Sequence, residues 1–417
     1  MTATTVPPLA EAAGRPAHRD PNVLRWLGAY TSSMIGDSVY YIALSWAAVR
    51  TGTPSEAGIV MAVSALPRAL LMLGGGVVAD RLGPRRVVIG SDAVRCAAVL
   101  AVAAVMFLTS PSLWLLALLA LVFGAVDAVF MPAVGALPAR ITGKDQLARV
   151  QGMRGLAIRC ASVVGAPLGG IAVATGGATA AFTLAGALIA VSVPLLISVR
   201  VRPVPTDDPA GAVAGTPWRD LRDGLSYIRS HRVLAPLMLA IALGDLGFVG
   251  PLNVGLTLLA DERGWGAAGM GWVLAGFGTG AGAASLLLAV RGRVGHAGRT
   301  AGCAILAGCV AIGALAFVPG VVAAVAVALL VGLLAGLSGA LCGALLQTQA
   351  DPAYLGRVTA VAGLVSLGIA PLSMPLSAAA AGAWGTGPVF VVSAAVCGLG
   401  GVVALCVRDL RRAELPR

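Results

Sequence analysis

Stretches of about 20 mostly apolar residues recur along almost the whole chain, and each is long enough as a helix to cross a membrane. Of the 417 residues, 58% are hydrophobic and 11% are charged, whereas soluble domains carry about a quarter charged residues. The sequence therefore predicts an all-α integral membrane protein. The 12 predicted transmembrane helices cover residues 23–49, 56–79, 87–109, 112–136, 152–174, 179–199, 233–256, 267–290, 300–318, 321–347, 358–380 and 388–407.

A change of composition divides these helices into two sets of six. Residues 200–209 have the proline and aspartate content of a loop, and residues 218–232 alternate apolar and charged residues with helical spacing. Arg81-Leu82-Gly83 after the second predicted helix recurs as Arg293-Val294-Gly295 after the eighth, which favours two pseudo-symmetric bundles. The expected parts are an N-terminal tail (1–22), a six-helix bundle (23–199), a linker with an amphipathic helix (200–232), a second six-helix bundle (233–407) and a C-terminal tail (408–417).

The distribution of basic residues predicts the orientation in the membrane. The net charge is +11, but the arginines fall on alternate loops and do not form one patch, so no nucleic-acid partner is expected. Among the loop arginines, only Arg50 and Arg263 would lie outside if both termini were cytoplasmic. We therefore expect a multi-pass protein of the cell membrane, with the lipid bilayer as its surroundings and the chain as a monomer.

The sequence offers no sign of a cofactor, a metal site or catalysis. The seven cysteines all fall within predicted helices and include no CxxC pair. Lys144 is the only lysine, and Gly143-Lys144-Asp145 lacks the upstream glycine and the Ser or Thr of a phosphate-binding loop. No nucleophile, base and orienting group occur together, so an enzyme is not expected. Active transport by this chain would have to use an ion gradient.

A charged turn between the second and third predicted helices carries the most specific motif. It reads Gly76-Val-Val-Ala-Asp80-Arg81-Leu-Gly83-Pro-Arg85-Arg86, with a glycine for the chain reversal and arginines at the membrane surface. This motif resembles the loop signature of the major facilitator superfamily. The resemblance implies the major facilitator fold, with 12 transmembrane helices in two six-helix bundles, and transport of a small-molecule substrate.

Further motifs resemble one branch of that superfamily, the macrolide-efflux and enterobactin-export proteins. They are Ser33-x-x-Gly36-Asp37, Leu66-Pro67, Ser91-Asp92-x-x-Arg95, Met131-Pro132-Ala133 and Gly356-Arg357-Val358. The branch implies proton-coupled multidrug efflux, and with it antibiotic resistance, at a bacterial inner membrane. One motif departs from the antiporter pattern, because Gly165-Ala166-Pro167-Leu168-Gly169-Gly170 has its proline displaced by one residue.

Four aspartates lie inside predicted helices, and each is a candidate functional site because an embedded charge is costly. Asp37 is on a polar and aromatic stripe of the first helix, and Asp245 is its counterpart in the second half. These two are the predicted proton carriers, with a buried hydrogen-bonding role as the alternative. Asp92, Arg95 and Asp127 are expected in the cytoplasmic third of their helices, where Asp127 would pair with Arg95 or a loop arginine.

The signature turn is expected to act in gating. Asp80 would cap the N-terminal end of the eleventh predicted helix, while Arg81, Arg85 and Arg86 would pair with Asp127 or other acids of their own half. This contact would hold the two halves together at the cytoplasmic side. The predicted gating residues are Gly76, Asp80, Arg81, Gly83, Arg85, Arg86, Arg95 and Asp127.

The predicted substrate cavity is mostly apolar, with few hydrogen-bonding groups, and suits amphiphilic or lipophilic compounds. Arg68 and Arg159 would either pair with Asp37 or bind an anionic part of the substrate. The predicted lining residues are Tyr30, Met34, Tyr41, Arg68, Phe123, Arg159, Phe248, Asn253, Trp272, Phe277 and Gln347.

The sequence thus predicts an exporter that exchanges protons for hydrophobic or amphiphilic small molecules by alternating access. Two alternatives stay open. One is dedicated export of a single metabolite, such as a siderophore or a self-made antibiotic. The other is a non-transporting membrane receptor with the same fold, against which the lack of a large extra cytoplasmic domain argues.

Overall fold

The computed structural model describes residues 17–109, 112–143, 146–201, 217–291, 295–351 and 354–415, and within these ranges all regular secondary structure is helical. The N-terminal half contains η1 (Ala17–Arg19), α1 (Pro21–Thr51), α2 (Pro54–Leu82), α3 (Pro84–Leu108), α4 (Leu113–Ile141) and α5 (Leu147–Ser198). The C-terminal half contains α6 (Pro217–Ser230), α7 (Leu234–Gly250), η3 (Pro251–Gly255), α8 (Leu256–Glu262), α9 (Gly266–Arg291), α10 (Ala297–Ala314), η4 (Leu315–Phe317), α11 (Val321–Gln349), α12 (Leu355–Trp384), α13 (Thr386–Cys406) and α14 (Arg408–Arg411).

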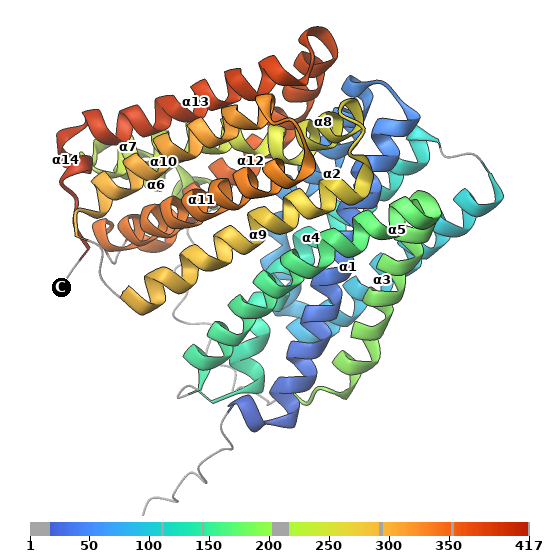
Figure 1. Cartoon of the computed structure of the whole chain (residues 1–417). Helices are drawn as coiled ribbons and strands as arrows, with labels where there is room; N and C mark the ends of the chain where they lie inside the picture. Colours follow the sequence, from blue (N-terminus) through green and yellow to red (C-terminus); the bar gives the residue numbers. More distant parts are fainter. Residues whose placement is uncertain are drawn as a thin grey trace, which may run out of the picture.

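The prediction of 12 membrane-crossing segments is confirmed once the long helices are divided correctly. Nine helical segments within the described ranges are long and apolar enough to cross a membrane, and α7, η3 and α8 together form one of them. Another is α5, whose 52 residues leave helical geometry at Gly176 and Gly177. Gly177 has φ 70°, a region that favours glycine, and Figure 1 shows the chain reversing there, so α5 supplies two segments. The 31-residue α1 and the 29-residue α2 complete the set.

Local sequence explains the two tight reversals around α2. Before α2, Thr53 Oγ1 accepts the Glu56 N–H at 3.3 Å and the Glu56 carboxylate accepts the Thr53 N–H at 2.7 Å. This capping box satisfies backbone donors that the first helical turn leaves free. After α2, Gly83 alone separates the two helices with φ 84°, and Pro84 begins α3. The signature turn is therefore a one-residue break between two long helices.

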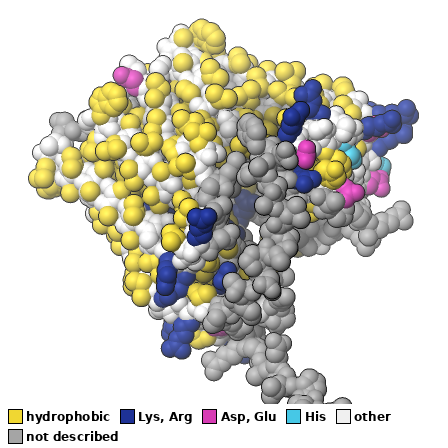
Figure 2. Space-filling model, turned by 180° about the vertical axis from the view of Figure 1, so that it is seen from behind, with side chains coloured by type: hydrophobic (Ala, Val, Ile, Leu, Met, Phe, Trp, Pro, Cys, Tyr) yellow, Lys and Arg dark blue, Asp and Glu magenta, His cyan; other side chains and the backbone are white. Residues whose placement is uncertain are grey.

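The two halves form bundles that meet at one end and diverge toward the other (Figure 1). Contact between the halves is made mainly by α2 packing against α12 and by α5 packing against α9. The starts of α1 and α7 and the end of α13 all lie at the diverging ends. Figure 2 shows a face covered largely by hydrophobic side chains, with Lys and Arg side chains gathered toward its edges, as expected for a surface that faces lipid.

A helix is present at the predicted amphipathic segment, and α6 packs against the C-terminal half. Ile228 is buried and Leu221 is partly buried in the cluster formed by the ends of α7 and α12. The Tyr227 ring stacks on Tyr354 with centroids 4.4 Å apart. Leu225 is 47% exposed. The apolar face of α6 was expected to lie along the lipid headgroups. Instead, part of this face packs against the protein and part of it, at Leu225, is exposed at the surface.

Candidate functional site

A buried arginine in the N-terminal half gathers three carboxylates from three helices. Arg95 and Asp92 lie one turn apart on α3, Asp37 lies on α1 and Asp127 lies on α4. The Arg95 side chain is fully buried, and the side chains of Asp92, Asp127 and Asp37 are 1%, 3% and 12% exposed. We call these four residues the Arg95 cluster.

One guanidinium nitrogen serves two of the carboxylates. Arg95 Nη1 donates to Asp37 Oδ1 and Oδ2 at 3.1 and 2.9 Å, and to Asp127 Oδ1 at 3.1 Å. The predicted pairing of Arg95 with Asp127 is therefore present. The prediction that Arg68 or Arg159 pairs with Asp37 is wrong, because Arg95 takes that position.

Hydroxyl groups complete the coordination of Asp92. Arg95 Nη2 donates to Asp92 Oδ1 and to Ser33 Oγ, the latter at 3.1 Å, and Ser33 Oγ donates to Asp92 Oδ1 at 3.1 Å. Ser192, on the second segment of α5, donates to the other Asp92 oxygen. The network thereby joins α1, α3, α4 and α5.

Two aromatic rings cover the Arg95 guanidinium. Its central carbon lies 3.9 Å from the Phe130 centroid and 5.3 Å from the Phe123 centroid, distances at which a cation is attracted to the ring face. Arg95 Nε has no hydrogen-bond partner within the described residues. The rings exclude water on the side that the carboxylates leave open.

A second arginine reaches the cluster from the interface between the halves. Arg68 Nη1 on α2 lies 3.7 Å from Asp127 Oδ2, and the Tyr41 hydroxyl lies 3.5 Å from the same oxygen. Arg68 is 27% exposed. Counting Arg68, the site holds three carboxyl groups and two guanidiniums, so it becomes neutral when it holds one proton.

The Arg95 cluster lies at mid-span, and the prediction that Arg95 and Asp127 lie in the cytoplasmic third is wrong. Asp127 is the middle residue of α4, while Asp37 and Arg95 are each one residue from the middle of their helices. The sequence placed the end of this helix at residue 136, but the helix continues through Pro132 and Pro138 to Ile141. The longer helix brings Asp127 level with Asp37.

The second predicted proton carrier is in a separate place. Asp245 on α7 lines a cavity of about 200 Å³ inside the C-terminal half, together with Cys342 and Cys397. Ser366 on α12 donates a hydrogen bond to Asp245 at 2.6 Å. No arginine of the described residues pairs with Asp245. Asp245 is thus an isolated carboxyl group, unlike Asp37.

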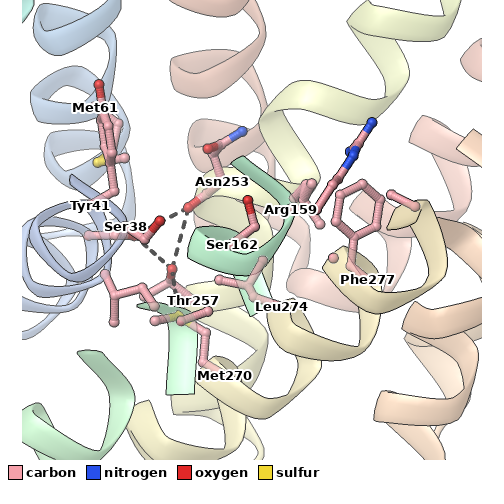
Figure 3. Close-up of a pocket in the computed structure, with 16 residues that line it drawn as sticks. Ser38, Tyr41, Met61, Arg159, Ser162, Asn253, Thr257, Met270, Leu274 and Phe277 are labelled. Atoms are coloured by element: carbon pink, nitrogen blue, oxygen red, sulfur yellow. Dashed lines mark hydrogen bonds between the residues drawn. The ribbon is translucent and has the colours of Figure 1, made fainter. Parts of the chain in front are cut away.

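A cavity of about 300 Å³ lies between the two halves (Figure 3). Figure 3 shows Tyr41 and Met61 on one side and Arg159 and Phe277 on the other. A second cavity of about 330 Å³ shares Tyr41, Met61 and Asn253 with the first and adds Arg68 to the wall. We call the two adjoining cavities the central chamber. Through Arg68 and Tyr41, the chamber borders directly on the Arg95 cluster.

The structure brings about half of the predicted cavity residues together. Tyr41, Arg68, Arg159, Asn253 and Phe277 line the central chamber, and Phe248 lines the cavity of Asp245. Three other predicted residues pack inside the N-terminal half: Tyr30, Met34 and Phe123. The last two, Trp272 and Gln347, are exposed and do not line the chamber.

The arginines of the signature turn lie at the surface. Arg81 and Arg86 are exposed, and Arg85 donates to the carbonyl oxygens of Leu196 and Ile197 at the end of α5. Their predicted pairing with Asp127 is wrong, because at about 1.5 Å per residue Asp127 lies about 20 Å from the end of α4. Gly76 and Asp80 lie within α2, but the side chain of Asp80 is outside what the structure describes, so the cap on the eleventh helix stays a prediction.

The halves touch closely at the end away from the chain termini. A Cβ built on Gly170 of α5 would lie 2.4 Å from the Ala267 carbonyl oxygen of α9, and one on Gly58 of α2 would lie 2.4 Å from the Ala378 side chain of α12. Both approaches are closer than a side chain allows. Nearby, Arg50 of α1 and Asp261 of α8 form an exposed ion pair at 3.2 Å.

The same helices are apart at the opposite end. A Cβ on Gly155 of α5, Gly282 of α9 or Gly363 of α12 would meet no atom within 4 Å. Leu156, beside Gly155, is 65% exposed. The central chamber is therefore sealed toward one end and open toward the end that carries α6.

Sequence reasoning missed several groups of the site. Ser33 is part of the quoted motif Ser33-x-x-Gly36-Asp37 and lies one turn before Asp37, a signal that was available. Ser192 gave no signal, because its approach to Asp92 depends on the reversal of α5. Phe130 and Ser366 also gave no signal, because each contacts its partner, Arg95 or Asp245, across the packing of two helices.

Comparison with characterised proteins identifies relatives that are membrane exporters. The chain is 27% identical over 247 residues to the multidrug efflux pump Tap of Mycobacterium tuberculosis, covering 54% of each protein. The chain thus spans about half the length of this relative. It is 24% identical over 330 residues to the enterobactin exporter EntS of Escherichia coli, covering 75% of this chain and 76% of EntS.

Solved structures of transporters share the fold. The nucleoside transporter NupG superposes with a TM-score of 0.69 at 13% identity, covering 94% of this chain and all of NupG. A bacterial homologue of the human lysosomal transporter Spinster, in an inward-facing and occupied conformation, gives a TM-score of 0.70 at 13% identity over 95% and 97% of the two chains. The family model for the Major Facilitator Superfamily matches residues 26–366. This chain is a multi-pass membrane transporter, and not an enzyme, because it belongs to the Major Facilitator Superfamily.

Proposed function

We propose that this protein exports hydrophobic or amphiphilic small molecules from the cell in exchange for protons. It works as a monomer by alternating access, with both termini in the cytoplasm. The end that is open in this structure carries the start of α1 and the end of α13, so with cytoplasmic termini the chamber opens inward. The central chamber then receives its substrate from the cytoplasm or the inner leaflet.

One observation supports the proton coupling. The buried site beside the substrate chamber has three carboxyl groups but only two guanidiniums. Such a site is neutral with one proton and carries a buried negative charge without it, a state that costs several kcal/mol unless the structure changes. Asp37 is the most exposed of the three carboxyl groups, and a proton carrier has to reach water. Asp37 therefore carries the proton, and Asp92 and Asp127 hold the arginines.

The names of the relatives supply two kinds of substrate, drugs for Tap and a siderophore for EntS. The chamber is lined by Met61, Met270, Leu274 and Phe277 beside a few hydroxyl groups. Flexible methionines and an aromatic ring accommodate varied apolar shapes. This lining supports multidrug efflux over dedicated export of one metabolite.

Substrate-driven proton flux tests the proposal. In proteoliposomes, Asp37→Asn should reduce the proton flux driven by macrolides, siderophores or other amphiphilic compounds to the level of empty liposomes. Because asparagine leaves two carboxylates for two guanidiniums, the variant should stay within about 1 kcal/mol of the parent's stability and should still bind substrate. A pH-sensitive dye inside the liposomes reports the flux.

Two variants make this test specific. Asp261→Asn removes a carboxylate from the exposed pair with Arg50 and should keep normal flux, because such pairs contribute little. Asp245→Asn should also keep proton coupling. Normal flux in Asp37→Asn, with flux lost in Asp245→Asn, would move the proton site to the C-terminal half. Substrate transport by the parent without proton movement would end the antiport proposal.

A further inference from the structure

The central chamber contains a cation that has no ion-pair partner among the described residues. Arg159 on α5 lines the chamber, and its side chain is exposed. No carboxylate within the described part of the chain forms an ion pair with Arg159, in contrast to Arg95, Arg68 and Arg50. A charged group placed on a helix within the membrane is a functional candidate by default.

Most other polar groups of the wall already donate a hydrogen bond within the protein. The hydroxyl groups of Ser38 and Ser162 donate to backbone carbonyls four residues earlier, each at 3.0 Å. Ser45 and Thr257 bond each other at 2.6 Å, and the Asn253 amide donates to the Val249 carbonyl at 2.8 Å. The free donors of the wall are therefore mainly those of the two arginines, Arg159 and Arg68, and only Arg159 has no carboxylate near it among the described residues. A guanidinium offers five N–H groups in a planar fork.

The electrostatics of the chamber favour the same kind of ligand. None of the described residues that line it is Asp or Glu. The three acids of the Arg95 cluster are buried in the N-terminal half and face guanidiniums, while Arg68 adds a second partly exposed positive charge to the wall. Planar guanidiniums bind carboxylate, phosphate and sulfonate oxygens in pairs.

We propose that the exported substrate is an amphiphilic anion whose acidic group binds Arg159. This inference rests on the proposed function and specifies its substrate class. The apolar body of the anion packs against Phe277, Leu274 and Met270, which line the same cavity as Arg159. A lipophilic cation finds no carboxylate in this wall and is repelled by both arginines.

Three naphthalene compounds with one scaffold test the charge preference: 2-naphthyloxyacetate, 2-(2-naphthyloxy)ethanol and 2-(2-naphthyloxy)ethylamine. Binding is measured by equilibrium dialysis with the full chain in lipid nanodiscs, after correction for empty nanodiscs. The parent should bind the carboxylate about tenfold or more tightly than the amine, as charge-assisted hydrogen bonds allow. Arg159→Gln should remove this preference and leave binding of the neutral alcohol unchanged. Arg159→Lys should restore part of it.

Arg149→Gln is the matched control, because Arg149 is exposed at the start of the same helix and does not line the chamber. It should bind all three compounds like the parent. Equal binding of carboxylate and amine by the parent, with the alcohol still bound, would overturn the anion inference and leave the export proposal standing. An equal loss of all three compounds in Arg159→Gln would show a steric role and also overturn it. No binding of any compound by the parent would remove both the inference and the chamber as substrate site.

Discussion

Replacing Arg95 with glutamine should lower the free energy of unfolding by about 3–5 kcal/mol, the cost typical of removing one partner from a buried ion pair. The cost is large because Asp37, Asp92 and Asp127 lose their common donor inside the membrane. Four helical segments meet at this network, so the loss should be visible as earlier unfolding of the whole N-terminal half. Titration with sodium dodecyl sulfate in mixed micelles, followed by circular dichroism, measures it.

Neutralising the stranded carboxylates should rescue the variant. Adding Asp37→Asn and Asp92→Asn to Arg95→Gln removes two of the three charges and should recover at least half of the lost stability. Arg86→Gln is the control, because Arg86 is exposed and its replacement should change stability by less than about 0.5 kcal/mol. If Arg95→Gln were as stable as Arg86→Gln, the cluster would not be what holds these helices together.

Features set by local sequence could be predicted. The number of membrane segments follows from apolar length, and the reversal at Gly83 follows from a glycine between two long apolar runs. The embedded aspartates and arginines were recognisable as unusual without any knowledge of the fold. Asp37, Asp92 and Asp127 lie in the N-terminal half and only Asp245 in the other, so the half that carries the charged site was predictable.

The pairing inside the membrane could not be predicted. Which carboxylate meets Arg95 depends on the depth and rotation of each helix, and the sequence ended the fourth helix five residues early, near Pro138. An error of that size moves a side chain by more than one helical turn. The contact of Ser192 with Asp92 needs the reversal at Gly177, a long-range effect. The charges were identified correctly, and the pairing of Asp127 with Arg95 was one of the predicted alternatives, but Asp37 was expected to pair with Arg68 or Arg159 and pairs with Arg95 instead.

The Arg95 cluster lies entirely within one half, while the chamber lies between the halves. Tyr41 and Arg68 belong to both, since each contacts Asp127 and lines the chamber. A proton that arrives at Asp37 weakens the pull of that carboxyl on Arg95, so Arg95 pairs more strongly with Asp127 and Asp127 attracts Arg68 less. The position of Arg68 in the chamber wall therefore depends on the charge of the cluster, which gives the proton and the substrate a shared group through which they compete.

Replacing Gly170 with leucine should shift the protein away from the conformation seen here, which is inward-facing under the proposed orientation. The side chain would have to occupy space now filled by the Ala267 carbonyl, because a Cβ alone would lie 2.4 Å from that oxygen. Overpacking of this kind costs about 1–3 kcal/mol, which changes a two-state population by about 5- to 150-fold. The outward-facing state opens this contact and avoids the cost. In intact cells, an impermeant maleimide should therefore label Ser162→Cys in the chamber at least about fivefold faster in the Gly170→Leu variant.

Gly155→Leu is the matched comparison, because it makes the same substitution on the same helix where a Cβ would meet no atom within 4 Å. In a background with the seven native cysteines replaced, it should make labelling from outside slower than in the parent. The reason is that closing the side that is open here brings α5 and α9 together at Gly155 and Gly282, and a leucine at Gly155 opposes this closure. Faster labelling in Gly170→Leu and slower labelling in Gly155→Leu would show that the two halves rock about the chamber, because the two substitutions lie at opposite ends of the first segment of α5. Equal labelling in both variants would mean that the close packing at Gly170 persists throughout the cycle, and the alternating-access proposal would have to place its moving contact elsewhere.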